Sequence, residues 1–177
     1  WVEVDTGSYC SVLFTDSEDY YIPFTGRKLM NLENTNKYRI VDFTGTGTDL
    51  NFTWDKTTNK CEITGYNDTG VDSTPMGGKG NIFACDVRTY YKENGLDLTW
   101  EEIAAQIGGD AQPYFDAEAG EFVFYVILAC PELGPSVSLG GGTIFTEYFV
   151  LDQEQTASTS SADKANVRVT SSIKGAT

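Results

Sequence analysis

Histidine is absent from this sequence of 177 residues. Imidazole is the general base of Ser-His and Cys-His nucleophiles and a frequent ligand of zinc, copper and haem. Its absence excludes those chemistries, and we expect no cofactor. Carboxylate catalysis, hard-metal sites and ligand binding without catalysis remain as possible functions.

Basic residues are also scarce. The chain has 12 Lys and Arg against 26 Asp and Glu, which gives a formal net charge of -14. Nucleic acids and anionic lipid surfaces are bound by clustered basic side chains, and the densest basic spot here is Arg27-Lys28. Nucleic acid is therefore excluded as a partner, while cations and neutral polar ligands remain.

Long apolar runs are missing as well. A membrane-spanning helix needs roughly 18 consecutive apolar residues, and the longest run here, Phe122 to Cys130, has only the length of a strand. We therefore expect no direct membrane insertion of this segment. The chain begins at Trp1 without a signal sequence, which indicates processing or trimming from a larger exported protein.

What the sequence does contain fits one domain with a tail. Hydrophobic residues make up 40% and aromatic residues 13% of the chain, which is enough for a buried core. We assign residues 1–151 to a β-rich domain and the polar residues 152–165, rich in Ser, Thr and Ala, to a linker. Residues 166–177 alternate again and form either a terminal strand or the start of a following segment.

The domain shows the two-residue alternation of β-strands along much of its length. The Gly-rich stretch 65–80 is predicted to be a long surface loop. Together these features predict an all-β fold, mainly antiparallel, built as a sandwich or as a barrel-like sheet. The predicted strands cover residues 8–14, 38–43, 50–54, 60–63, 81–91, 122–130 and 143–151, with an edge segment at 20–24.

One short α-helix is predicted near residues 99–108. Thr99 and Glu102 match a capping box, in which each side chain binds the backbone N–H of the other residue. Gly108 is expected to end the helix.

Two predicted hairpins follow the same pattern. Residues 54–59 and residues 115–120 each begin with an aromatic residue followed by Asp, and end in Asn or Gly. Asp caps such a turn, and Asn or Gly tolerates the left-handed conformation at its end.

The four cysteines, Cys10, Cys61, Cys85 and Cys130, are irregularly spaced and contain no C-x-x-C pair. A zinc or iron–sulfur site is therefore not expected. Each cysteine lies on the apolar stripe of a predicted strand, where it acts as a small buried hydrophobe. We favour free buried thiols, with at least one disulfide as the alternative that exported proteins suggest.

The motif Asp5-Thr6-Gly7-Ser8 resembles the active-site signature of aspartic proteases, and a second Asp-Thr-Gly occurs at 68–70. In that family two such aspartates share a proton and activate water. The resemblance implies Asp5 and Asp68 as the catalytic pair of an acid peptidase. Asp-Thr-Gly is also an ordinary turn sequence, and two β-turns are the interpretation that we favour.

Acidic loops are candidate sites for a hard cation. Asp16, Glu18 and Asp19 lie close together in one loop, and Asp110 and Asp116 flank another segment. None of them has the spacing of an EF-hand, and an acidic chain is expected to carry solvated acidic loops. We therefore predict no metal site, with Asp16, Glu18 and Asp19 as the alternative.

Aromatic side chains near loops and element ends are the candidate ligand-binding residues. Flat rings stack on sugars and combine with polar groups at binding sites. The alternative is that these rings close the edges of the core. The candidates are Tyr20, Tyr21, Tyr66, Tyr90, Tyr91 and Trp100.

Two formal N-glycosylation sequons begin at Asn51 and Asn67. The alternation around Asn51 predicts that its side chain faces solvent.

Four stretches together resemble the β-rich domains of secreted lipoproteins from Bacteroidetes. They are Trp1-Val2 with Thr6-Gly7-Ser8-Tyr9, Asn36-Lys37-Tyr38-Arg39-Ile40, Phe52-Thr53-Trp54-Asp55 with Thr58-Asn59, and Tyr114-Phe115-Asp116 with Gly120-Glu121-Phe122. The resemblance implies a periplasmic or outer-surface, extracellular location and tethering through an upstream lipid-modified segment. It implies no catalytic residues. The chain departs from this pattern at its cysteines and in residues 65–80.

Three hypotheses of function follow. The first is a non-catalytic surface domain for adhesion or for binding a glycan or a protein ligand. The second is an acid peptidase that uses Asp5 and Asp68, and the third is a structural spacer of a surface lipoprotein. We favour the first, and thus a protein that is not an enzyme, because loop aromatics lie on an acidic β scaffold without histidine.

Overall fold

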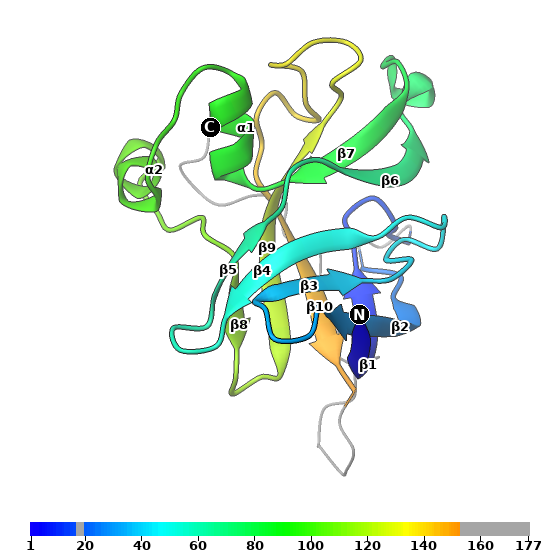
Figure 1. Ribbon diagram of the computed structural model, residues 1–177. Coiled ribbons are helices and arrows are strands. Elements are labelled where there is room, and N and C mark those ends of the chain that lie inside the picture. Colours follow the sequence, from blue (N-terminus) through cyan, green and yellow to red (C-terminus); the bar gives the residue numbers. More distant parts are fainter. Residues whose placement is uncertain (17–19, 153–177) are drawn as a thin grey trace.

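Residues 1–16 and 20–152 are described by the computed structural model shown in Figure 1. Their strands are β1 (Val2–Cys10), β2 (Phe24–Asn31), β3 (Lys37–Ile40), β4 (Leu50–Asp55), β5 (Lys60–Ile63), β6 (Asn67–Asp72), β7 (Asn81–Cys85), β8 (Tyr114–Asp116), β9 (Glu121–Ala129) and β10 (Phe145–Leu151). Their helices are the 3-10 helix η1 (Thr74–Met76) and the α-helices α1 (Val87–Glu93) and α2 (Trp100–Ile107). The predicted linker, apart from Asp152, and the predicted final strand at 166–177 lie outside the described residues.

In the described chain, eight antiparallel strands close into a barrel. Their order is β10-β1-β2-β3-β4-β5-β8-β9, and the pairing of β9 with β10 joins the two ends. The strand β9 serves two parts of the sheet, because Glu121–Val126 pair with β10 whereas Ile127–Ala129 pair with β7. As a result, β7 and β6 extend from the barrel as a two-stranded arm (Figure 1). The predicted antiparallel, mostly β fold is confirmed, and it takes the form of a barrel-like sheet and not of a sandwich.

Side chains that alternate along the strands fill the barrel and cover its outside. On β9, Phe122 and Phe124 belong to the barrel interior, while Ile127 packs with residues of α1 and α2. The ring of Phe52 on β4 lies 5.3 Å from that of Phe122 and 5.1 Å from that of Phe124. Each fully buried side chain of this kind stabilises the fold by about 1.5–3 kcal/mol.

All four cysteines are buried and free, as predicted. Cys61 and Cys130 belong to the barrel interior, Cys85 packs with the helices, and Cys10 contacts Tyr21 in a small separate cluster. Burial raises the pKa of the Cys10 thiol to about 12 and raises the pKa of Cys61 and of Cys85 as well. These thiols therefore act as packing groups.

The first strand begins earlier than predicted. β1 spans Val2–Cys10, so that Asp5-Thr6-Gly7 lies inside a strand and does not form a turn. A Cβ atom at Gly7 would lie 2.5 Å from the carbonyl oxygen of Val150 and 2.9 Å from the Phe149 ring. Glycine is needed here because the backbone of β10 approaches closely and leaves no room for a side chain.

The second Asp-Thr-Gly is also not a turn. It lies in β6, inside the stretch 65–80 that was predicted to be a loop. Its strand forms because tertiary contacts outweigh the poor strand propensity of Asp and Gly. The hydroxyl of Thr69 donates a 2.7 Å hydrogen bond to the carbonyl of Ile82 on β7. The buried amide of Asn67 joins β6 to β7 by donating to the carbonyl of Ala84.

The prediction of a strand over 81–91 and of a single helix is wrong. The strand β7 ends at Cys85, and Asp86 starts α1 by accepting a 2.8 Å hydrogen bond from the N–H of Thr89. The other carboxylate oxygen of Asp86 accepts from the N–H of Ile63 on β5 at 3.0 Å. Valine and tyrosine in α1 have strand propensity, but the buried N-cap decides in favour of a helix.

Strand β2 was not predicted either. Among its eight residues only Leu29 is buried, so it lacks the alternation that marks a half-buried strand. The expected edge segment at 20–24 contributes an isolated bridge between Tyr21 and Thr15.

The predicted helix near 99–108 and the paired hairpins are confirmed. Thr99 and Glu102 make both bonds of the capping box, at 2.9 and 3.1 Å. Asn59 and Gly120 end their turns with φ of 62° and 70°. The two hairpins lie side by side, because β5 pairs with β8.

Among the described residues, no helix combines the length and the apolar character that crossing a membrane requires.

Candidate functional site

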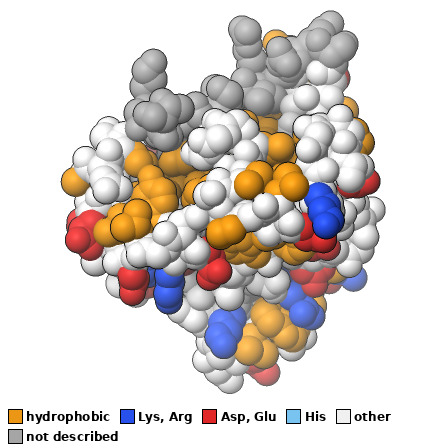
Figure 2. Space-filling view, turned by 90° about the horizontal axis from the view of Figure 1, so that it is seen from above, with side chains coloured by type: hydrophobic (Ala, Val, Ile, Leu, Met, Phe, Trp, Pro, Cys, Tyr) orange, Lys and Arg blue, Asp and Glu red, His pale blue; other side chains and the backbone are white. Residues whose placement is uncertain are grey.

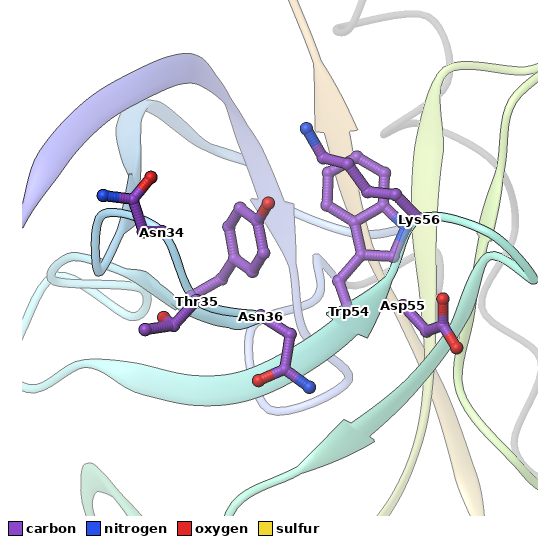
Figure 3. Close-up of a pocket in the computed structure, with 7 residues that line it drawn as sticks. Asn34, Thr35, Asn36, Trp54, Asp55 and Lys56 are labelled. Carbon is purple, nitrogen blue, oxygen red and sulfur yellow. The ribbon is translucent and has the colours of Figure 1, made fainter.

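A cavity of about 420 Å³ opens at the end of the barrel where the β2–β3 and β4–β5 turns lie. We name it the Trp54 cavity. It is lined by Asn34, Thr35, Asn36, Tyr38, Trp54, Asp55 and Lys56 (Figure 3). Mouths of β-barrels are common positions for ligand sites, and an aromatic surface with a few polar groups is their usual lining.

The indole of Trp54 is held in place from several sides. Its ring centroid lies 5.3 Å from that of Tyr38 and 4.9 Å from those of both Phe115 and Phe122. Its N–H donates a 3.2 Å hydrogen bond to the side-chain oxygen of Asn59. The side chain is only half-buried, so a fixed aromatic surface remains available to a ligand.

The β2–β3 turn forms the opposite wall. The Thr35 hydroxyl donates to the carbonyl of Leu32 at 2.6 Å, and the carbonyl of Asn36 accepts from the Trp54 backbone N–H at 3.0 Å. Asn34 takes the left-handed conformation with φ of 66°. The side chains of Asn34 and Asn36 are exposed and make no hydrogen bond to another described residue. The backbone is therefore fixed while both amides remain free to bind.

The two charged side chains of the cavity differ in direction. The ammonium of Lys56 lies 4.9 Å from the centre of the Trp54 ring. The carboxylate of Asp55 accepts a 2.9 Å hydrogen bond from the N–H of Thr57, and Figure 3 shows it directed away from the indole. The cavity thus presents one cation beside its indole, one carboxylate directed away from the indole, and several neutral polar groups.

None of the six aromatic residues predicted from the sequence lines this cavity. Tyr21 and Tyr90 are buried, and their hydroxyls donate to the carbonyls of Thr146 and Ser136. The others are placed as follows: Tyr66, Tyr91 and Trp100 pack against the helix cluster, and Tyr20 is exposed elsewhere.

The two aspartates of the peptidase hypothesis lie in β1 and β6, which are not neighbours in the sheet. Asp5 accepts a 2.9 Å hydrogen bond from the N–H of Thr6. Asp68 accepts from the N–H of Gly70 at 2.7 Å and from the Asn81 amide at 3.0 Å. Each carboxylate thus accepts hydrogen bonds from groups close to it in the fold, and no hydrogen bond joins Asp5 to Asp68.

The acidic loops do not assemble a metal site in the part of the chain that the structure describes. The carboxylate of Asp16 accepts from the N–H of Tyr20 at 3.1 Å. Glu18 and Asp19 lie outside the described residues. Asp110 and Asp116 accept backbone N–H groups of their own turns.

A second, smaller cavity of about 160 Å³ lies between η1 and the segment after β9. Met76 and Leu133 beside it are exposed, and hydrophobic side chains gather on this face of the molecule (Figure 2). Its polar lining groups are used internally, since the Ser73 hydroxyl donates to Gly80 and the Ser138 hydroxyl accepts from the N–H of Gly142. The Trp54 cavity has free polar groups and is therefore the better candidate.

The strand assignment of Tyr38 and Trp54 from the sequence is correct, and Tyr38 is buried, but it did not indicate that the half-buried Trp54 lies at a cavity. The available signal was the end of the apolar alternation at Trp54, directly before the polar turn residues Asp55 and Lys56. That position places an aromatic ring at the rim of a barrel.

Comparison of the chain with protein-family models, with curated proteins and with solved structures gives no match.

Proposed function

We propose that this protein is a non-catalytic binding domain that recognises a glycan in the Trp54 cavity. The observation that carries the proposal is a rigid, half-exposed indole at a cavity whose lining includes two amides that bind no other described residue. An aromatic face packs against the C–H groups of a sugar ring, while amides bind its hydroxyls as donors and acceptors.

The setting of this function is part of the proposal. By the resemblance to secreted lipoprotein domains, the protein acts in the periplasm or on the outer surface, where it serves adhesion or the capture of glycans. A peptide is the alternative ligand, since rings and amides also bind extended chains.

The first experiment is a screen of the wild-type protein on an array of oligosaccharides, followed by titration of the hits with tryptophan fluorescence as the readout. The variant Trp1→Phe removes an exposed indole outside the cavity and lowers the background. We expect quenching or a spectral shift to persist in Trp1→Phe. A complete absence of oligosaccharide binding would contradict the proposal and favour the spacer role.

Two variants then test the position of the site. Tyr38→Phe removes one hydroxyl and Asn36→Ala one amide, and neither group makes a hydrogen bond to a described residue. Loss of one ligand hydrogen bond of about 0.5–1.5 kcal/mol should weaken binding roughly 2- to 10-fold. Tyr20→Phe, an exposed tyrosine outside the cavity, is the matched control. Unchanged affinity in both cavity variants would place the ligand elsewhere.

A further inference from the structure

We infer that the glycan bound in the Trp54 cavity carries a carboxylate, as a uronic acid unit does, and that Lys56 is the residue that selects it. This inference rests on the proposed glycan-binding function and names the class of its ligand.

The charge of Lys56 is uncompensated. No carboxylate of the described residues lies within ion-pair distance of its ammonium, whereas Arg27, Lys28, Arg39 and Arg88 have such a partner. Lys37, Lys60, Lys79 and Lys92 also make no ion pair with a described residue, and Lys56 differs from them in lying at a cavity beside an indole. An ammonium has three N–H donors and no acceptor capacity. Those of Lys56 make no hydrogen bond to a described residue, so they are available to an anionic ligand group.

Arg39, a second cation that lies over an indole, differs from Lys56 because its charge is paired. The guanidinium of Arg39 lies 4.3 Å from the centre of the Trp1 ring, and its charge is also paired with Asp49 at 3.8 Å. Lys56 has the same kind of ring contact, at 4.9 Å from Trp54, without the carboxylate. The indole holds the ammonium at the cavity, where its N–H groups remain able to bind a ligand carboxylate.

The geometry of the cavity fits a sugar acid. Lys56 lies on the side of Trp54, and Asn34 lies across the cavity on the β2–β3 turn (Figure 3). A sugar ring between them has its carboxylate near the ammonium and its hydroxyls toward the amide of Asn34. Charge-assisted hydrogen bonds to a carboxylate are stronger than neutral ones. Asp55 opposes this attraction only from a distance, because its carboxylate is directed away from the indole and makes no ion pair with Lys56.

The net charge of the protein limits further which acidic ligands can bind. A net charge of -14 repels polyanions over distances of the order of the Debye length, which is about 8 Å at physiological ionic strength. The local attraction of Lys56 acts at contact. The expected ligand is therefore a short oligosaccharide with few carboxylates and not a densely sulfated polymer.

The test is isothermal titration of the intact protein with short oligosaccharides that carry a single galacturonate, glucuronate or mannuronate unit, each compared with its carboxyl-reduced, neutral counterpart. We compare wild type, Lys56→Met and the control Lys79→Met. Lys79 is an exposed lysine between η1 and β7, outside the cavity. Methionine keeps an unbranched side chain and removes the charge. Thermal unfolding of each variant verifies that the fold is retained.

For wild type and Lys79→Met, we expect at least one acidic oligomer to bind roughly 2- to 5-fold more tightly than its neutral counterpart, the upper part of the range for an exposed ion pair. Lys56→Met should remove that preference and leave the affinity for the neutral oligomer within about twofold.

Equal or tighter binding of the neutral oligomers by wild type would overturn the inference, as would an acid preference that survives in Lys56→Met. Both results would leave the glycan-binding proposal in place. If wild type binds neither the acidic nor the neutral oligomers, and no other glycan, the inference and the proposed function fail together.

Discussion

The hydroxyl of Tyr9 donates a 2.7 Å hydrogen bond to the carboxylate of Glu147, and both side chains are buried. The other carboxylate oxygen accepts from the hydroxyl of Ser11 and from the N–H of Val12. The three donors come from β1 and the turn after it, while Glu147 belongs to β10. This network joins the first and last strands of the described barrel through a single buried acid.

The unfolding free energy should depend on the protonation of Glu147. Burial raises the pKa of this carboxyl above its ordinary value of 4.5, and the three hydrogen bonds oppose that shift without cancelling it. A raised folded-state pKa means that the folded protein binds the proton more tightly than the unfolded chain. The resulting stabilisation is complete below about pH 4.5 and is lost as the pH rises through the folded-state pKa.

Urea unfolding of wild type and of Glu147→Gln between pH 4.5 and pH 8 measures this effect, with the range chosen around the ordinary glutamate pKa of about 4.5. The difference in unfolding free energy should move in favour of wild type as the pH falls. The comparison removes the contribution of the other acids, which both proteins share. A difference that is constant, or that moves toward the variant at low pH, would contradict the raised pKa.

Tyr9→Phe should destabilise the protein by about 1.5–3 kcal/mol at neutral pH, because it removes a hydrogen bond to a buried acidic group. Chemical unfolding measures the change. Tyr20→Phe removes an exposed hydroxyl and should stay within about 0.5 kcal/mol of wild type. A similar small effect of Tyr9→Phe would show that the bond contributes little.

Asn67→Asp should destabilise the protein by about 2 kcal/mol or more. The buried amide accepts from Asn51 and donates to the carbonyls of Thr64 and Ala84. Aspartate lacks the N–H donors and adds a charge. Asn36→Asp makes the same replacement on an exposed side chain, and it controls for the effect of changing Asn to Asp without burial. The same contacts make the Asn67 sequon incompatible with a glycan in the folded protein, and they leave Asn51 only partly exposed.

The four thiols should be unreactive in the folded protein. They are buried and free, and burial raises the pKa of the Cys10 thiol to about 12, so that its thiolate is scarce at neutral pH. A thiol reagent without added reductant should label none in buffer and four in denaturant. Fewer than four in denaturant would indicate a disulfide.

The elements predicted from the sequence are those whose signals are local. The capping box at Thr99 and the turn residues Asn59 and Gly120 act through adjacent backbone groups, and each is found as expected. Gly7 and Asn67 act across the sheet, on β10 and β7, and a single sequence does not reveal which strands meet there.

The Trp54 cavity was not predicted because strand β2 was not recognised in the sequence, so the β2–β3 turn that forms one wall was not expected. The β2–β3 and β4–β5 turns lie side by side because β3 pairs with β4. The predicted aromatic residues Tyr21 and Tyr90 instead use their hydroxyls to bind buried carbonyl groups, which aromatic content alone does not indicate.

The most direct test of glycan binding in the Trp54 cavity is a titration that follows the indole N–H signals by NMR. The chain has three tryptophans, and the variants Trp1→Phe and Trp100→Phe assign their signals. We predict that a bound oligosaccharide shifts the signal of Trp54, whose N–H donates to Asn59, and leaves those of Trp1 and Trp100 unchanged. A shift confined to Trp1 or Trp100, or no shift with saturating oligosaccharide, would contradict the account.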